Sequence, residues 1–290
     1  MPAKAKANQC SPTHQDVFKQ DRTCLTKEEL VRLVTAYNRS RVSGNAKHLA
    51  VTGTKAALWT RLDERMRAEV GAGNEAAWAD RLPAQVKDAF TPKKPAEWAK
   101  NEYTWLTNLD IDRVMRQYEQ EPSYTYKYLG ALSVDFATAG QCDYYADACK
   151  LDFAELKRRK VRYAGMVINT DPHDEPGQHW ISLFIVADPS LPSYGAYFYD
   201  SVADAPPPEV KAYMLDLRKR NPNANRKFRL AYSGRRMQWK NTECGVFSMA
   251  YQVRWLNMLR AKHGQVDMKL VVDQKIDDDD IHQLRDVLFR

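Results

Sequence analysis

The sequence predicts an α+β protein, with a central mixed β-sheet flanked by helices and a helical arm module ahead of it. Apolar residues follow a helical period in several segments before residue 120, and the period changes to strand-like runs from residue 161. Helical patterns return beside and after these strands. Since the strands are grouped and helices follow at one end, an α+β core is favoured over a regular βαβ repeat.

The arm begins with polar residues 1–24, which carry no clear period and are expected to form a mobile or loosely docked tail. Helical spacing starts in LTKEELVRLVTAYNRS, where Thr26 and Glu29 can form a capping box. After the turn-rich RVSGNAK, the segment GTKAALWTRLDERMRAEV predicts a second helix with Thr54 as its cap.

Two short helices joined by such a loop resemble a SAP-type helix–loop–helix, a module that often binds DNA. A nucleic-acid contact through this arm is therefore one hypothesis, and a packing or substrate-docking role is the other. The mixed stretch 67–97 ends in the turn-forming TPKKPAEW. We therefore expect the arm to occupy residues 1–100 and the main domain to occupy residues 101–290.

The main domain opens with an amphipathic helix in YTWLTNLDIDRVMRQYEQ, for which Asn108 or Asp110 is the expected cap. The aromatic-rich YKYLGALSVDFAT is expected to be an extended segment or a loop. Four strands are predicted after it, at 161–170, 179–187, 195–201 and 227–234. The second of them, HWISLFIVA, is a nearly continuous apolar run, which predicts a strand covered on both faces.

Three helices complete the main domain. Prolines open APPPEVKAYMLDLRKRN, which suits the start of a helix between the last two strands. A longer helix is predicted from Cys244 to about Arg260, with Phe247, Tyr251 and Trp255 on its apolar side. A short helix ends the chain.

Composition excludes some classes of protein. The chain has 290 residues, 44% of them apolar, and no stretch approaches the about 18 uninterrupted apolar residues of a membrane span. The basic start MPAKAKANQC leads into no apolar segment, which argues against a signal peptide. A net charge of +7 spread along the chain favours solubility, with affinity for nucleic acid or an acidic surface as the alternative.

The cysteines and histidines argue against disulfides and metals. Five cysteines, an odd number in a chain without a secretory signal, predict free thiols in a reducing compartment and no disulfide framework. His173 and His179 are six residues apart with no cysteine at zinc spacing, so no metal site is expected. No other cofactor is indicated.

The groups that a thiol nucleophile requires occur in the order His179, Asp200, Gln238 and Cys244. His179 opens the second predicted strand and Asp200 ends the third, so the two side chains meet if these strands are neighbours. Asp200 would then accept a hydrogen bond from Nδ1 of His179 and orient the imidazole as a general base.

Cys244 is expected in the first turn of its helix, where the helix dipole and a nearby imidazolium favour the thiolate. Gly245 leaves room beside the sulfur for a substrate backbone. The backbone N–H of Cys244 and the side-chain amide of Gln238 could together bind an oxyanion. Each residue also has a structural interpretation: a buried thiol, a core histidine, a turn aspartate and a solvated glutamine.

The segments HW at 179–180, YFYDS at 197–201 and Q-x5-CG at 238–245 resemble the superfamily of ubiquitin-like-protein-specific and adenovirus-type cysteine proteases. The resemblance covers about residues 105–290 and implies a papain-like thiol protease core. It implies that Cys244 is the nucleophile, His179 the general base, Asp200 its orienter and Gln238 the oxyanion donor. It also implies that Trp180 helps to wall the substrate site.

The flanking segments NTECGVFSM, TWLTNLDIDRVMRQYE and CLTKEELVRLVTAYN are similar to the virion-maturation polyprotein proteases of large nucleocytoplasmic DNA viruses, including that of African swine fever virus. This implies an endopeptidase that cleaves viral core polyproteins after Gly-Gly-Xaa sites, at the virus factory in the host cytoplasm and in the virion. Three alternatives stay open: a deconjugating enzyme for ubiquitin-like modifiers, an acyltransferase, and a non-catalytic basic scaffold that binds DNA. In the scaffold, Cys244 would be buried and inert.

Overall fold

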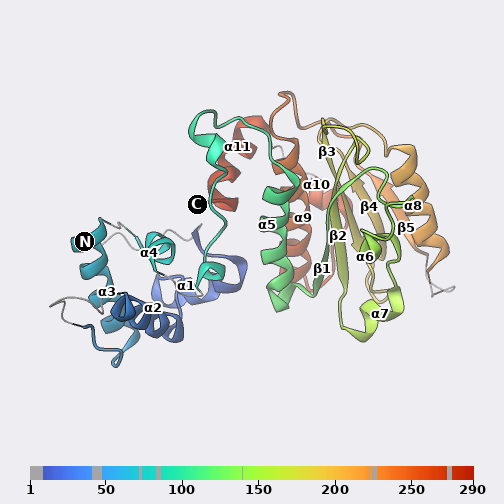
Figure 1. Ribbon diagram of the computed structural model, residues 1–290. Helices are drawn as coiled ribbons and strands as arrows, with labels where there is room; N and C mark the ends of the chain where they lie inside the picture. The colour runs from blue at the N-terminus through green and yellow to red at the C-terminus, as the bar shows by residue number, and fades with distance from the viewer. Residues whose placement is uncertain are drawn as a thin grey trace. The chain divides into compact units, whose positions relative to one another are not determined.

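The computed structural model describes residues 9–40, 48–71, 74–82, 86–138, 140–221, 223, 227–272 and 276–290. The chain divides into two compact units, whose elements are labelled in Figure 1. The helical unit comprises Met1–Lys93 together with Asp286–Arg290, and the sheet unit comprises Lys94–Arg285. In the described residues, no helix is both long enough and apolar enough to cross a lipid bilayer.

The helical unit is built around leucine and tryptophan side chains that are buried in one core, including Leu33, Leu62 and Trp78. Its α-helices are α1 (Gln15–Asp21), α2 (Lys27–Arg39), α3 (Lys55–Val70) and α4 (Glu75–Arg81). The predicted capping box of α2 is present, and the Thr54 side chain accepts from the Ala57 amide at the start of α3 as predicted. The turn-rich RVSGNAK lies outside the described residues.

The prediction of a loosely docked N-terminal tail is wrong for residues 9–24, whereas residues 1–8 lie outside the described part. Cys10 and Cys24 are both buried in the core of the helical unit, and Phe18 of α1 packs with them. Cys10 also pairs with Phe90 in an isolated antiparallel bridge. Cys10, Phe18 and Cys24 become buried together only when this segment folds back, so its mostly polar composition did not predict their burial.

The prediction that all the cysteines are free thiols is also wrong. Disulfides join Cys10 to Cys24 and Cys142 to Cys149, with Cα atoms 5.2 and 5.4 Å apart. Helix α1 lies between the first pair, and a run of turns lies between the second, so the chain folds back on itself within each short interval. Cys244 is the one free cysteine.

A five-stranded mixed sheet forms the centre of the sheet unit, which confirms the predicted α+β class. The strands are arranged in the same order in space as along the chain. Neighbouring strands pair in parallel at the two edges (β1 with β2, β4 with β5) and antiparallel in the middle. The strands are β1 (Tyr126–Ser133), β2 (Tyr163–Asn169), β3 (Trp180–Val186), β4 (Gly195–Tyr199) and β5 (Arg229–Tyr232).

Strand β1 lies in the segment that was predicted only as extended or loop. Its register against β2 shifts between Tyr128 and Ala131, and Gly130 within the shift has φ of 122°. That conformation favours glycine and interrupts the regular alternation of side chains along the strand. The interruption explains why the alternating pattern of a strand was not evident in the sequence.

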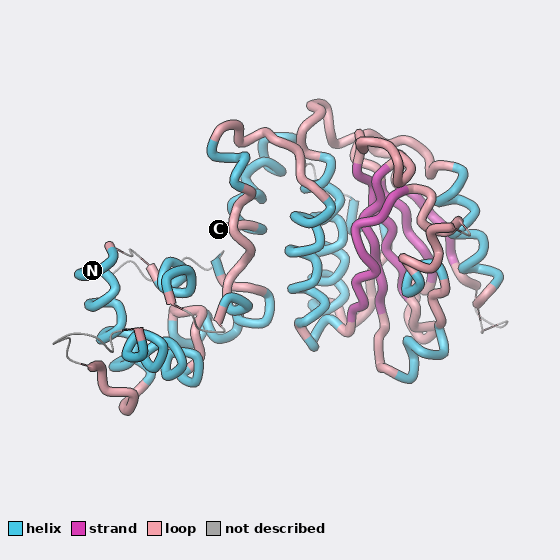
Figure 2. Tube along the Cα trace, viewed as in Figure 1, coloured by secondary structure: helices cyan, strands magenta, loops and turns pink. Residues whose placement is uncertain are grey.

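Helices cover both faces of the sheet, as Figure 2 shows. Side chains of α6, α7 and α8 share one core cluster with alternate strand residues such as Leu183 and Phe198. Helices α5 and α9 lie on the other face, where Phe184 of β3 stacks on Trp255 at 5.0 Å. Every residue of β3 is buried, as the apolar run predicted. The helices of this unit are η4 (Ala96–Ala99), α5 (Asn108–Gln120), η5 (Pro122–Tyr124), α6 (Ala146–Cys149), α7 (Phe153–Arg158), α8 (Pro208–Lys219), α9 (Cys244–Ala261), α10 (Met268–Val272) and α11 (Asp278–Leu288).

Among the helices that were predicted, only α5 has a different cap from the one expected, whereas α1, α4, α6, α7 and α10 were not predicted. The N-cap of α5 is Thr107, whose side chain accepts from the Asp110 amide, and the Asp110 carboxylate accepts in return from the Thr107 amide. Asn108 is the first helical residue. The predicted cap was therefore shifted, because Asp110 closes a capping box from inside the helix and does not start it.

Candidate active site

His179 and Asp200 meet at one end of the sheet because β3 and β4 are antiparallel neighbours. His179 directly precedes β3 and Asp200 directly follows β4, so the pairing brings both to the same edge. Nε2 of His179 lies 2.8 Å from Oδ1 of Asp200, which is 3% exposed. The hydrogen bond uses Nε2 where Nδ1 was predicted. The imidazole therefore turns its other nitrogen away from the carboxylate.

Cys244 is the first residue of α9 and is 3% exposed. Its sulfur is close enough to His179 to raise the pKa of the imidazole. Burial lowers the pKa of His179, but hydrogen bonds to Asp200 and Cys244 and the negative charges of these two groups raise it to about 10. At neutral pH the imidazole is consequently protonated.

The pH dependence of the reaction should show the loss of the proton from His179. Because the pKa of His179 is raised, the imidazolium persists through neutral pH and is lost only as the pH rises through about 10. We expect kcat/KM for peptide cleavage to fall along an alkaline limb near that pH. In Asp200→Asn the amide oxygen still accepts from Nε2 but the charge is gone, so the limb should move to lower pH. If kcat/KM falls at the same pH in wild type and in Asp200→Asn, the negative charge of Asp200 does not raise the pKa of His179.

Gln238 is held by the residue that follows Asp200. Its Oε1 accepts from Oγ of Ser201 at 2.6 Å, and its Nε2 donates to the Lys240 carbonyl at 2.6 Å. A carbonyl can only accept, so this contact fixes which end of the amide is the NH2 group. The Ser201 carbonyl in turn accepts from the backbone amides of Met237 and Gln238. The end of β4 thus positions both the partner of His179 and the amide predicted to bind the oxyanion.

The Nε2 atom of Gln238 carries two N–H groups, and one of them donates to the Lys240 carbonyl. The first-turn amides of a helix such as α9 have no partner within the helix. Gln238 is 2% exposed, so it is not the solvated loop residue of the structural interpretation. Removing one oxyanion donor typically costs about 10²–10³ in kcat.

Gly245 packs tightly against two residues that wall a pocket. A Cβ atom at this position would lie 3.3 Å from both Leu106 Cδ1 and Trp180 Cδ1. A side chain here would therefore push against the wall next to the thiol. The predicted direct contact of Gly245 with substrate remains a prediction, and its observed role is to let Trp180 lie close to the start of α9.

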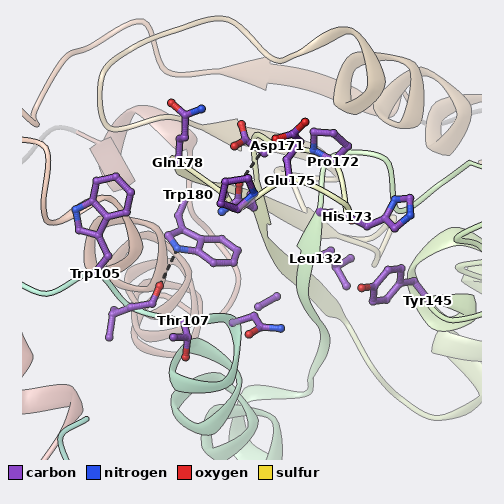
Figure 3. A pocket seen from close by; sticks show the side chains of 17 residues that line it. Trp105, Thr107, Leu132, Tyr145, Asp171, Pro172, His173, Glu175, Gln178 and Trp180 are labelled. Atoms are coloured by element: carbon purple, nitrogen blue, oxygen red, sulfur yellow. Dashed lines mark hydrogen bonds between the residues drawn. The ribbon is translucent and has the colours of Figure 1, made fainter. Parts of the chain in front are cut away.

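Leu106 and Trp180 also line a pocket of about 440 Å³. Figure 3 shows Trp105 and Trp180 at one end of it and His173 with Tyr145 at the other. The Trp180 indole donates to the Leu106 carbonyl at 3.1 Å, which fixes the ring in place. Trp105 was not predicted as a pocket residue, since the only sign of it in the sequence is an aromatic residue just before the α5 cap.

The charged side chains that line this pocket are Asp171, Glu175 and His173. His173 is paired with Asp135 at 2.6 Å, which raises its pKa, so the pair is close to neutral overall. The lining is therefore acidic in a chain with a net charge of +7. Among the residues that the structure describes, no group of three or more His, Cys, Asp or Glu side chains is placed to hold a metal ion.

Proteins that carry a helix-start thiol against an imidazole, with that imidazole held by a buried acid, use the sulfur to attack acyl carbons. This geometry and the α+β fold define a cysteine-type endopeptidase. Known proteins agree with that class, although no family model matches the chain.

A thiol protease of Acanthamoeba polyphaga mimivirus is 23% identical over 307 aligned residues, which cover 98% of this chain and 93% of that protein. The cysteine protease of African swine fever virus (isolate Tick/Malawi/Lil 20-1/1983) is 25% identical over 224 residues, covering 74% of this chain and 78% of the relative. The crystal structure of the African swine fever virus protease superposes with a TM-score of 0.60 at 17% identity, over 99% and 97% of the two chains. The chain is thus similar to viral cysteine proteases, in agreement with the predicted resemblance to ubiquitin-like-protein-specific and adenovirus-type cysteine proteases.

Proposed function

We propose that this cysteine protease cleaves viral structural polyproteins after Gly-Gly-Xaa sites during virion maturation, at the virus factory in the host cytoplasm and in the virion. The observation that carries the Gly-Gly preference is the restricted access to the nucleophile. Cys244 is 3% exposed, and Trp180 packs at the residue beside it. A peptide chain without side chains is the one that reaches such a sulfur most easily.

In the proposed reaction Cys244, Gln238 and His179 act on the substrate, and Asp200 holds His179 in place. The Cys244 thiolate attacks the scissile carbonyl carbon, and the resulting oxyanion is bound by the Cys244 amide and the Gln238 side chain. The protonated His179 gives its proton to the leaving amine as the C–N bond breaks, which leaves a thioester on Cys244. Neutral His179 then takes a proton from water, whose oxygen attacks the thioester; the C–S bond breaks, which releases the carboxylic acid product and restores the Cys244 thiolate beside protonated His179.

A viral polyprotein is favoured as substrate because the mimivirus and African swine fever virus relatives are viral proteases. One isolate of African swine fever virus carries a relative that is named a SUMO-1 cysteine protease, which supports deconjugation as the second candidate. The two substrates differ in the bond that is cut, an ordinary peptide bond or an isopeptide bond to a lysine side chain. Contact with nucleic acid through α2 and α3 remains a proposal, supported by the resemblance of these helices to a SAP-type module and by the basic net charge.

The Gly-Gly preference can be tested with a peptide panel. Purified protein should cleave Gly-Gly-Xaa peptides, and replacing either glycine by alanine should lower kcat/KM by about 10²-fold or more, because a methyl group collides with a rigid wall. An isopeptide-linked Gly-Gly substrate in the same panel separates deconjugation from polyprotein cleavage. Equal cleavage of the glycine and alanine peptides would refute the proposed specificity, and Cys244→Ala excludes a contaminating protease.

A further inference from the structure

The C-terminal helix α11 contacts the loop 239–243 that joins the oxyanion donor Gln238 to the nucleophile Cys244. At the start of the loop, the Asp278 carboxylate accepts from the backbone amides of Trp239 and Lys240, at 2.9 and 3.2 Å. Asp278 is itself buried, with 6% of its surface exposed. One aspartate at the first turn of α11 therefore fixes two consecutive peptide units directly after Gln238.

The other end of the loop is bound one and two turns further along α11. Glu243, the residue before Cys244, accepts from Nδ1 of His282 at 2.9 Å and from Nε of Arg285 at 2.8 Å. The Arg285 and Glu243 side chains are 3% and 1% exposed, so this is a fully buried ion pair. Arg285 also donates to the Thr242 carbonyl at 3.3 Å.

Arg285 has further contacts that fix its own position. Its Nη1 donates to the backbone carbonyls of Glu102 and Thr104, and its guanidinium lies 4.3 Å from the centre of the Trp98 ring. The positive charge is therefore placed to neutralise a carboxylate that would otherwise stand next to the Cys244 thiolate and oppose it. Breaking a buried pair from one side leaves an uncompensated charge, which is strongly destabilising.

We propose that α11 is the positioning element for the active-site loop: Asp278 and Arg285 hold the 239–243 loop at both ends, and so set the separation between Gln238 and Cys244. Lys240 connects Gln238 to α11. Its carbonyl accepts from the Gln238 side chain, and its backbone amide donates to Asp278. Both proposed oxyanion donors are thus positioned by contacts with the same helix, α11. The proposal rests on the proposed roles of Gln238 and Cys244.

Loosening this loop should harm the transition state more than substrate binding, because the oxyanion forms only as the sulfur attacks. In Asp278→Ala we expect kcat to fall by about 10- to 100-fold with KM nearly unchanged, as a misplacement of about 1 Å is enough for such a loss. In Asp278→Asn the side-chain oxygen still accepts from both amides, so most of the activity should return. Asp280→Ala is the matched control, since it removes an exposed aspartate from the same helical turn without touching the loop.

The rate of alkylation of Cys244 by iodoacetamide separates positioning from a general loss of structure. Alkylation requires the thiolate but no oxyanion donor, so Asp278→Ala should react within about twofold of wild type while kcat falls. Wild-type kcat in Asp278→Ala, or a parallel loss in Asp280→Ala, would overturn the proposal. If Asp278→Ala does not fold, Arg285→Lys provides the same test: it keeps the charge opposite Glu243, and unchanged kcat would overturn the proposal. Failure of wild-type protein both to cleave peptides and to be alkylated at Cys244 would instead refute the proposed function.

Discussion

Cys244→Ala should abolish cleavage of a Gly-Gly-Xaa peptide, with kcat lower by a factor on the order of 10⁶, while the protein stays folded. The expected loss is this large because the sulfur forms the covalent bond to the acyl group, and no other side chain can replace it. The fold should survive because the change removes a single atom from the first turn of α9, where alanine is a good helix residue. Cleavage is measured by separating the peptide products, and folding by circular dichroism.

Two controls make the Cys244 result decisive. Cys244→Ser keeps a nucleophilic atom in place but is also expected to be inactive, since the hydroxyl is not ionised by the imidazolium beside it. The other four cysteines are in disulfides, so iodoacetamide without reductant should label Cys244 alone. If Cys244→Ala cleaved as fast as wild type, the nucleophile assignment would be wrong.

His179→Ala is expected to be nearly as severe, with kcat lower by a factor of about 10⁴–10⁶. Without the imidazolium, the sulfur loses the positive charge that favours its ionised form, and the leaving amine has no proton donor. Because the two residues act as a unit, the double variant Cys244→Ala with His179→Ala should be no slower than either single variant. A double variant that lost activity multiplicatively would show that His179 and Cys244 act independently.

His14 offers a matched control for His179. It also pairs with a carboxylate, since its Nε2 lies 3.1 Å from Oε1 of Glu29, but it belongs to the helical unit. His14→Ala should therefore leave kcat unchanged for a short peptide. A comparable loss in His14→Ala would indicate that removing any buried histidine–carboxylate pair inactivates the protein by unfolding it.

Local patterns were enough to predict most of the secondary structure. The capping box at Thr26, the apolar run after His179 and the prolines before α8 each determine a local conformation through short-range sterics and hydrogen bonds. Strand β1 was less evident because the register shift at Gly130 breaks its alternation. The Cys10–Cys24 disulfide was missed because it depends on how a polar segment folds back, which no short-range pattern reports.

The order of His179, Asp200, Gln238 and Cys244, together with the family resemblance of the segments around them, predicted the class of enzyme and a candidate site from the sequence. Only the tertiary structure decided that Nε2 of His179 contacts Asp200, that Ser201 holds Gln238, and that α11 binds the 239–243 loop. The physical reason is one of distance along the chain. Motif residues lie at the ends of elements whose local pattern is visible, whereas Glu243 and Arg285 are 42 residues apart and become partners only when packing buries both charges together.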